Sequence, residues 1–83
     1  MKTLSNLVGC STYLVSDNTS NRCNFHGLVE CNDDLLDELK CGTEVGLQDV
    51  NPRVLQTFRD NDVDLNEYTH CIIVGNDYYL SWE

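Results

Sequence analysis

Three cysteines and one histidine toward the middle of the chain have side chains that could bind zinc. The candidate ligands are Cys23, His26, Cys31 and Cys41. Thiolates and imidazoles are the usual ligands of structural zinc, which would stabilise a small domain. Residues three apart on a strand point to opposite faces, however, so Cys23 and His26 would converge only at a turn or a bulge. The chain also has no Cys-x2-Cys pair, so we expect buried thiols and no metal or other cofactor.

An aspartate-rich segment has part of the pattern of a calcium-binding loop. Asp60, Asp62 and Asp64 stand at what would be the first, third and fifth positions of an EF-hand loop. Leu65 stands where that loop requires glycine, and Cys71 stands where a glutamate would close the site. We therefore expect a solvated acidic loop at this point and no calcium site.

The chain offers little for catalysis. His70 and Cys71 are adjacent, so on a strand they point to opposite faces and cannot form a nucleophile-base pair. The sequence has no G-x-S-x-G, phosphate-loop or H-E-x-x-H motif. A carboxylic acid that donates a proton near neutral pH needs burial to raise its pKa, and acids crowded on a short helix are exposed to solvent. We expect a protein that is not an enzyme.

Carboxylates are concentrated in the middle of the chain. The protein has 14 acidic and 5 basic residues, and residues 30–67 hold eleven of the acids and three of the bases. This segment therefore carries -8 of the net charge of -9. A chain with so few lysines and arginines repels phosphate backbones, so we expect no direct binding to nucleic acid. We predict that ten of these carboxylates bind a basic protein partner: Asp33, Asp34, Asp37, Glu38, Glu44, Asp49, Asp60, Asp62, Asp64 and Glu67.

Four stretches of the chain have the composition of β-strands. Ser11–Val15 and Arg22–Glu30 are rich in β-branched and aromatic residues and flank a turn-rich segment, which predicts a hairpin. Cys71–Val74 is apolar on both faces, which predicts a central strand. A short Gly-Asn-Asp turn joins it to a last strand that ends at Trp82.

Alternation assigns the side chains of two of these strands to faces. In the second strand one face should carry Cys23, Phe25, Gly27 and Val29. In the last strand the inner face should carry Tyr78, Leu80 and Trp82. Tyr79 would then lie on the opposite face, where it is a candidate for an exposed interface anchor.

Two helices are indicated by the residues at their ends. The first should begin after Asn32, a good N-cap residue, and end before Gly42, a natural C′ residue. The second should begin at Pro52 after the N-cap residue Asn51, and end near Asn61.

These elements predict an α+β fold in the order ββααββ. We expect a small antiparallel sheet with two short helices packed on one face. The 83 residues should form a single domain, residues 1–83, because a chain this short builds only a thin core.

The first predicted helix has a carboxylate face opposite a leucine face. At 100° per residue its four acids span about 140°, and its leucines Leu35, Leu36 and Leu39 lie on the other side. An amphipathic helix with an ordinary solvated face is the alternative interpretation. A single lysine, Lys40, accompanies the acids, and the loops around the second helix add charges of the same sign. This pattern favours a surface that meets a positively charged partner.

In its small size, its acidity and its lack of a catalytic motif, the chain resembles the small acidic inhibitors of phages and mobile elements, which include anti-CRISPR proteins and DNA-mimic anti-restriction proteins. These proteins share no common motif, so the resemblance assigns no role to any residue and names no target. It implies a non-enzymatic inhibitor that binds the basic nucleic-acid-binding surface of a host defence complex.

Three alternatives remain open at the level of sequence. The first is an immunity protein or antitoxin whose acids neutralise a basic nuclease toxin, because the electrostatics would be the same. The second is a zinc-stabilised interaction module, and the third is a structural subunit whose acids serve solubility.

The sequence favours a cytoplasmic protein, in the host cell cytoplasm if a phage encodes it. No stretch approaches the roughly 18 apolar residues of a membrane span, so we expect no membrane partner. The residues Leu7–Cys10 match a lipoprotein cleavage pattern, but Ser5 and Asn6 interrupt the apolar segment that would have to precede it. The five cysteines are an odd number, which favours reduced thiols.

Overall fold

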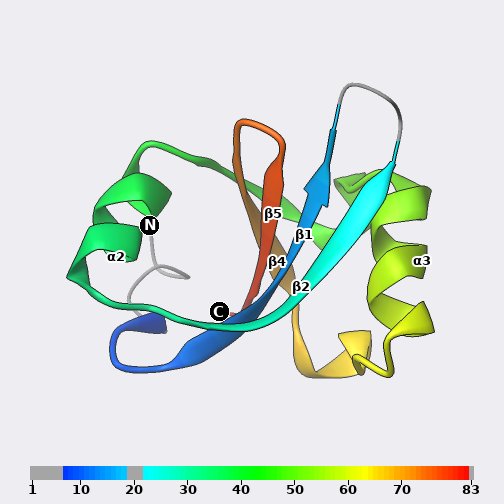
Figure 1. Cartoon of the computed structure of the whole chain (residues 1–83), viewed down its shortest axis with the longest axis horizontal. Helices are drawn as coiled ribbons and strands as arrows, with labels where there is room; N and C mark the ends of the chain where they lie inside the picture. The colour runs from blue at the N-terminus through cyan, green and yellow to red at the C-terminus, as the bar shows by residue number, and fades with distance from the viewer. Residues whose placement is uncertain (1–6, 19–21, 83) are drawn as a thin grey trace.

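A five-stranded antiparallel sheet with a helix on each side forms the computed structural model, which describes residues 7–18 and 22–82 (Figure 1). The α+β class predicted from the sequence is confirmed. The elements are β1 Ser11–Asp17, β2 Cys23–Glu30, α2 Asp33–Lys40, β3 Thr43–Gly46, the 3-10 turn η1 Leu47–Asp49, α3 Pro52–Asp60, the 3-10 turn η2 Leu65–Glu67, β4 His70–Val74 and β5 Asp77–Ser81.

The strand order in the sheet is β2-β1-β5-β4-β3, and every neighbouring pair is antiparallel. The two edges are therefore β2 and β3, and β4 lies inside the sheet as predicted. Strands β1 and β5 pair although they stand near opposite ends of the described chain, with Leu14 opposite Tyr79.

The predicted order ββααββ is wrong because a fifth strand, β3, lies between the helices. This strand pairs with β4 from Thr43, opposite Ile73, to Gly46, opposite His70. It has only four residues and ends in glycine, so it lacks the apolar alternation by which strands are detected in a sequence.

The prediction that both helices pack on one face of the sheet is also wrong. Adjacent residues of a strand point to opposite faces, and both faces of β4 and β5 are buried. The α3 side contains one core, made of Val15, Val50, Val54, Phe58, Val63, Cys71 and Leu80. The α2 side contains the other, made of Leu7, Cys31, Leu39, Ile72 and Tyr79. We call these the α3-side core and the α2-side core.

Tyr79 illustrates the consequence of covering both faces. Its side chain is only 4% exposed and belongs to the α2-side core, so it is not the exposed interface anchor that alternation suggested. The opposite face of β5 is buried as well, since Leu80 is 0% exposed.

A β-bulge in β2 changes the faces on which its side chains lie. Leu14 pairs with Gly27 and Val15 pairs with Phe25, so His26 is an extra residue in the ladder. Gly27 has φ +84°, a conformation that glycine adopts without strain. The predicted common face of β2 is therefore wrong: Phe25 packs against the α3-side core and Val29 against the α2-side core.

Both helices begin as the sequence predicted. The side chain of Asn32 accepts a hydrogen bond from the backbone N–H of Leu35 at 2.9 Å, which caps α2. The side chain of Asn51 accepts one from the N–H of Arg53 at 3.1 Å, with proline in the first turn of α3.

The two helices end in different ways. A Cβ atom on Gly42, after α2, would lie 2.8 Å from the Ile72 side chain and 2.9 Å from the backbone oxygen of Ile73, so β4 leaves room only for glycine. After α3 the left-handed position is taken by Asp62, with φ 65°. The N–H groups of Asp62 and Val63 donate to the carbonyls of Arg59 and Phe58, as in a Schellman motif.

Candidate partner-binding surface

Helix α2 presents the predicted carboxylates to solvent. Its four acids are exposed, while Leu39 is fully buried and Leu35 and Leu36 are half-buried against the α2-side core. Glu44 on β3 pairs with Ile72, a residue of the same core, so its side chain lies on the same side of the sheet. We call these five residues the α2 acidic patch: Asp33, Asp34, Asp37, Glu38 and Glu44.

Among the residues that the structure describes, Lys40 is the only ion-pair partner of the four acids of α2. The Lys40 Nζ lies 3.5 Å from Oδ1 of Asp37, and both side chains are more than 60% exposed, so this ion pair contributes little to stability. Within the described residues Asp33, Asp34 and Glu38 make no ion pair. The like-charged pairs four residues apart each cost about 0.2 to 0.5 kcal/mol in an exposed helix.

A second group of predicted acids lies on the other side of the sheet. Asp60 ends α3 and accepts a hydrogen bond from Nε2 of Gln56 at 2.8 Å, and Asp64 caps η2 through the N–H of Asn66 at 3.0 Å. We call the exposed acids of this region the α3 acidic patch: Asp60, Asp62, Asp64 and Glu67. Asp49 is exposed before the opposite end of α3.

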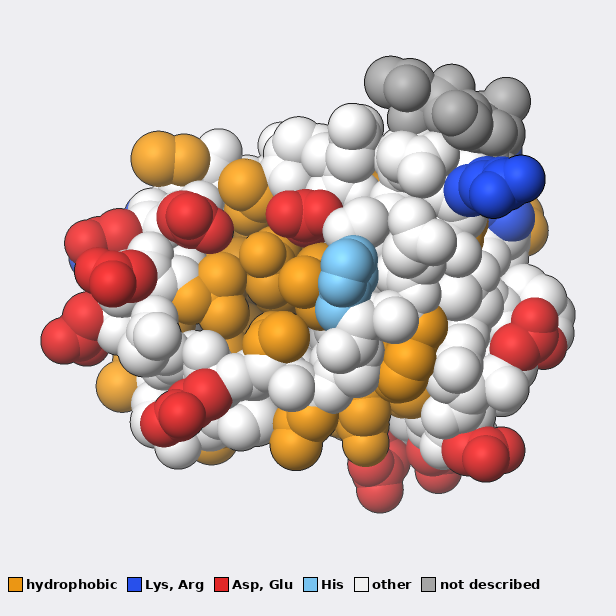
Figure 2. Space-filling view, in the orientation of Figure 1, with side chains coloured by type: hydrophobic (Ala, Val, Ile, Leu, Met, Phe, Trp, Pro, Cys, Tyr) orange, Lys and Arg blue, Asp and Glu red, His pale blue; other side chains and the backbone are white. Residues whose placement is uncertain are grey.

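The ten predicted residues therefore do not form one continuous face. Figure 2 shows acidic side chains at the left, over α2, and again at the lower right, toward the end of α3 and η2, with hydrophobic surface between the two groups. The division follows from the helices covering opposite faces of the sheet.

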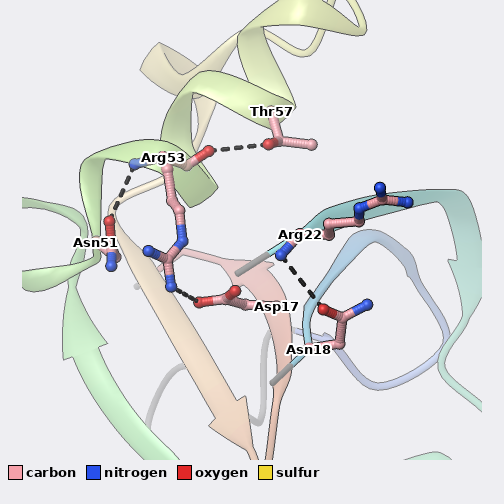
Figure 3. Close-up of polar contacts among 6 residues, drawn as sticks. All are labelled: Asp17, Asn18, Arg22, Asn51, Arg53 and Thr57. Atoms are coloured by element: carbon pink, nitrogen blue, oxygen red, sulfur yellow. Dashed lines mark hydrogen bonds and ion pairs between the residues drawn. The ribbon is translucent and has the colours of Figure 1, made fainter. Parts of the chain in front are cut away.

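One of the few basic residues, Arg53, forms an ion pair between two elements of the fold. Nη2 of Arg53, in the first turn of α3, lies 2.7 Å from Oδ2 of Asp17 at the end of β1 (Figure 3). The Asp17 side chain is only 10% exposed, and this hydrogen bond is the main cause of the raised pKa of Arg53. The ion pair therefore joins α3 to the β1–β2 hairpin. Nearby, the backbone N–H of Arg22 donates to Oδ1 of Asn18 at 3.2 Å.

On the face shown in Figure 2, most of the visible Lys and Arg side-chain surface of the described residues lies away from α2. The main group of Lys and Arg side chains in Figure 2 lies at the upper right, at the far end from the acids over α2. The field of the α2 acidic patch would attract a positively charged surface.

The four candidate zinc ligands are not brought together. The bulge that could have joined Cys23 to His26 leaves Cys23 against the α3-side core, while Nε2 of His26 lies 2.8 Å from Oγ of Ser16. Cys31 is buried in the α2-side core, and Cys41 is exposed after α2. Across ranges 7–18 and 22–82, no three His, Cys, Asp or Glu side chains are grouped in a way that could hold a metal ion.

His70 and Cys71 have separate environments. The Cys71 thiol is 0% exposed in the α3-side core, and burial raises its pKa to about 12. Nδ1 of His70 lies 2.8 Å from Oγ1 of Thr69. The thiol of Cys71 is therefore protonated at neutral pH and remote from solvent.

One surface feature was missed by the sequence reasoning. A shallow open pocket of about 250 Å³ is lined by Glu67, Tyr68 and Trp82, whereas Trp82 was predicted to lie on the inner face of the last strand. Tyr68 and Trp82 are far apart in the sequence and meet through the pairing of β4 with β5, so no local pattern could indicate the pocket.

Comparison of the chain with protein-family models, curated proteins and solved structures finds no match. None of the helices in the described ranges has the length and apolar character needed to cross a membrane.

Proposed function

We propose that this protein is a non-enzymatic inhibitor that binds a basic nucleic-acid-binding surface of another protein through the α2 acidic patch. The observation that supports this proposal is the orientation of α2. Its leucines are buried against the sheet, and its four carboxylates point to solvent with one exposed lysine as their only ion-pair partner among the described residues.

The electrostatic cost of this arrangement favours a positively charged partner. Each like-charged pair on α2 is unfavourable in the isolated protein, and the attraction of two acids to the helix N-terminus offsets only part of that cost. A surface rich in lysine and arginine would reverse the sign of the interaction. Surfaces that bind nucleic acid have this composition, because they neutralise phosphates.

The proposed inhibition is competition for the basic surface. While the α2 acidic patch covers the residues that would contact phosphate, nucleic acid cannot reach them. The class resemblance supports a host defence complex as the target, since small acidic inhibitors of phages and mobile elements act on such complexes.

The test compares two variants with the same change in charge. The first replaces Asp33, Asp34, Asp37 and Glu38 with lysine, and the control replaces Asp49, Asp60, Asp62 and Asp64 with lysine. The immobilised wild-type protein is used to capture a partner from a host lysate at two salt concentrations, and the affinity of each variant for that partner is then measured. We expect the first variant to lose at least about 100-fold in affinity and the control much less, because charge pairs act at short range in salt.

A neutral variant separates charge from folding. Asp33→Asn, Asp34→Asn, Asp37→Asn and Glu38→Gln keep the shape of the side chains, and circular dichroism checks that α2 is retained. Equal losses in both lysine variants, binding that does not weaken as salt rises, or capture of no basic partner would each contradict the proposal.

A further inference from the structure

The pocket next to η2 is built by the end of the sheet. The backbone N–H of Thr69 donates to the carbonyl of Ser81 at 3.1 Å, which extends the pairing of β4 and β5 beyond His70. Tyr68 follows η2, Trp82 follows β5, and this pairing places their rings in contact. The ring centroids are 5.9 Å apart with an interplanar angle of 61°, an edge-to-face arrangement.

The pocket lies between the two sides of the molecule. Tyr68 packs against the α3-side core and Trp82 against the α2-side core. The same end of the sheet carries Glu30, which pairs with Ser11 and is separated from α2 by two residues. A partner that covers the first turn of α2 and continues around this end of the sheet would therefore reach the pocket.

The pocket combines aromatic faces with a negative charge. Its third lining residue, Glu67, is exposed, and its carboxylate is near enough to contribute to the raised pKa of Tyr68, after the larger effects of burial and of Tyr13. The volume of about 250 Å³ is smaller than the usual size of pockets for drug-sized ligands, so it suits one side chain.

We propose that this pocket binds the guanidinium group of an arginine side chain carried by a peptide or protein. The faces of tryptophan and tyrosine rings attract cations, and tryptophan does so most strongly. A planar guanidinium stacks on aromatic rings and forms two parallel hydrogen bonds to a carboxylate such as that of Glu67. An ammonium group is more strongly hydrated and cannot stack in this way.

The assignment of the arginine to a partner protein rests on the proposed function, in which that partner has a basic surface. The chemistry of the pocket can be tested without that partner. Trp82 is the only tryptophan of the chain, so its fluorescence reports directly on the pocket. The protein is titrated with capped Gly-Arg-Gly, with the same peptide containing neutral citrulline, with the lysine peptide and with ethylguanidinium.

We expect a saturable change in Trp82 fluorescence with the arginine peptide, weaker binding of the lysine peptide and of ethylguanidinium, and none of the citrulline peptide. Glu67→Gln should lower the affinity for the arginine peptide at least about fivefold, because it removes the charge of the hydrogen-bond acceptor. The matched control Asp60→Asn removes the same charge from the same patch outside the pocket and should change the affinity less than about twofold. Movement of the Trp82 indole N–H resonance gives an independent readout.

Equal binding of the citrulline peptide, or an unchanged affinity in Glu67→Gln, would overturn the guanidinium assignment. Equal binding of ethylguanidinium would overturn the assignment to an arginine within a polypeptide. Lysine substitution of the four acids of α2 should leave this titration saturable while it abolishes binding to the captured partner, so the two proposals can fail separately.

Discussion

Helices α2 and α3 are of similar length and cover opposite faces of the same sheet, yet their exposed surfaces differ. Outside its buried positions α3 carries both signs of charge, with two arginines and one aspartate, whereas α2 carries four acids and one lysine. Both helices bury an apolar stripe, so anchoring to the sheet does not explain the difference. Helix α3 therefore has the mixed charges of an ordinary solvated helix. Helix α2 differs from it because nearly all of its exposed charges are negative.

The residues that follow the C-terminal ends of the two helices also differ. Glycine stands after α2 because β4 approaches closely there, while the left-handed position after α3 is held by Asp62. The α2 end is constrained by packing, and the α3 end retains a carboxylate where glycine would fit without strain.

The largest expected effect on the free energy of unfolding comes from truncating a buried side chain in each core. Comparing the two losses shows which core contributes more to stability. Phe58→Ala should lower the free energy of unfolding by about 4 kcal/mol, and Leu39→Ala by about 3 kcal/mol, because the α3-side core has more buried residues and phenylalanine is the larger side chain. Urea unfolding followed by circular dichroism measures both. A larger loss for Leu39→Ala would show that the α2-side core is the more important.

The next effect concerns the end of α2. Gly42→Ala places a Cβ against Ile72 and the backbone of Ile73, which should cost about 2 kcal/mol in unfolding free energy. The matched control Cys41→Ala changes the neighbouring exposed residue and should cost less than about 0.5 kcal/mol. If the two variants are equally stable, the close contact with β4 does not constrain this end.

The pH dependence reports on the α3-side core. The pKa of Cys71 is raised from 9.0 to about 12, so above pH 9 the unfolded chain loses a proton that the folded protein keeps. Stability is therefore complete below pH 9 and falls as pH rises, by about 1.4 kcal/mol at pH 10. Thermal unfolding between pH 7 and pH 10 measures the fall. Cys71→Val, similar in volume, should flatten the curve, and an unchanged curve would assign the loss to other groups.

The smallest effect concerns the end of α3. Asp62→Gly should raise the free energy of unfolding by about 0.5 kcal/mol, because glycine adopts the left-handed conformation without the steric cost of a Cβ. Asp60→Gly makes the same change within the helix and should lower it by up to about 1 kcal/mol. Thermal unfolding distinguishes these opposite signs.

Local features of the fold could be predicted from the sequence. The N-caps Asn32 and Asn51 were correctly identified, because capping depends on residues within one turn of the chain. The exposed position of the α2 acids was predicted from helical periodicity alone. The four longer strands were recognised by their β-branched and aromatic residues, with boundaries that differ by one or two positions.

Non-local features could not be predicted. The strand β3 forms because β4 offers it an edge, and the bulge at His26 depends on the register with β1. The placement of the helices on opposite faces had one local signal, the apolar character of both faces of Cys71–Val74, which indicates a sheet covered on both sides. No local signal in the sequence indicated the pocket lined by Glu67, Tyr68 and Trp82, because Tyr68 and Trp82 meet only once β4 and β5 are paired.

The central position of β5 also determines when the protein can fold. In the sequence the β1–β2 hairpin and the β3–β4 pair both precede β5, and neither can complete the sheet without it. Until β5 pairs with them, β1 and β4 each present an unpaired edge, which is a site for aggregation or for binding by chaperones. The sheet and the pocket lined by Tyr68 and Trp82 are therefore completed only when β5 pairs with β1 and β4.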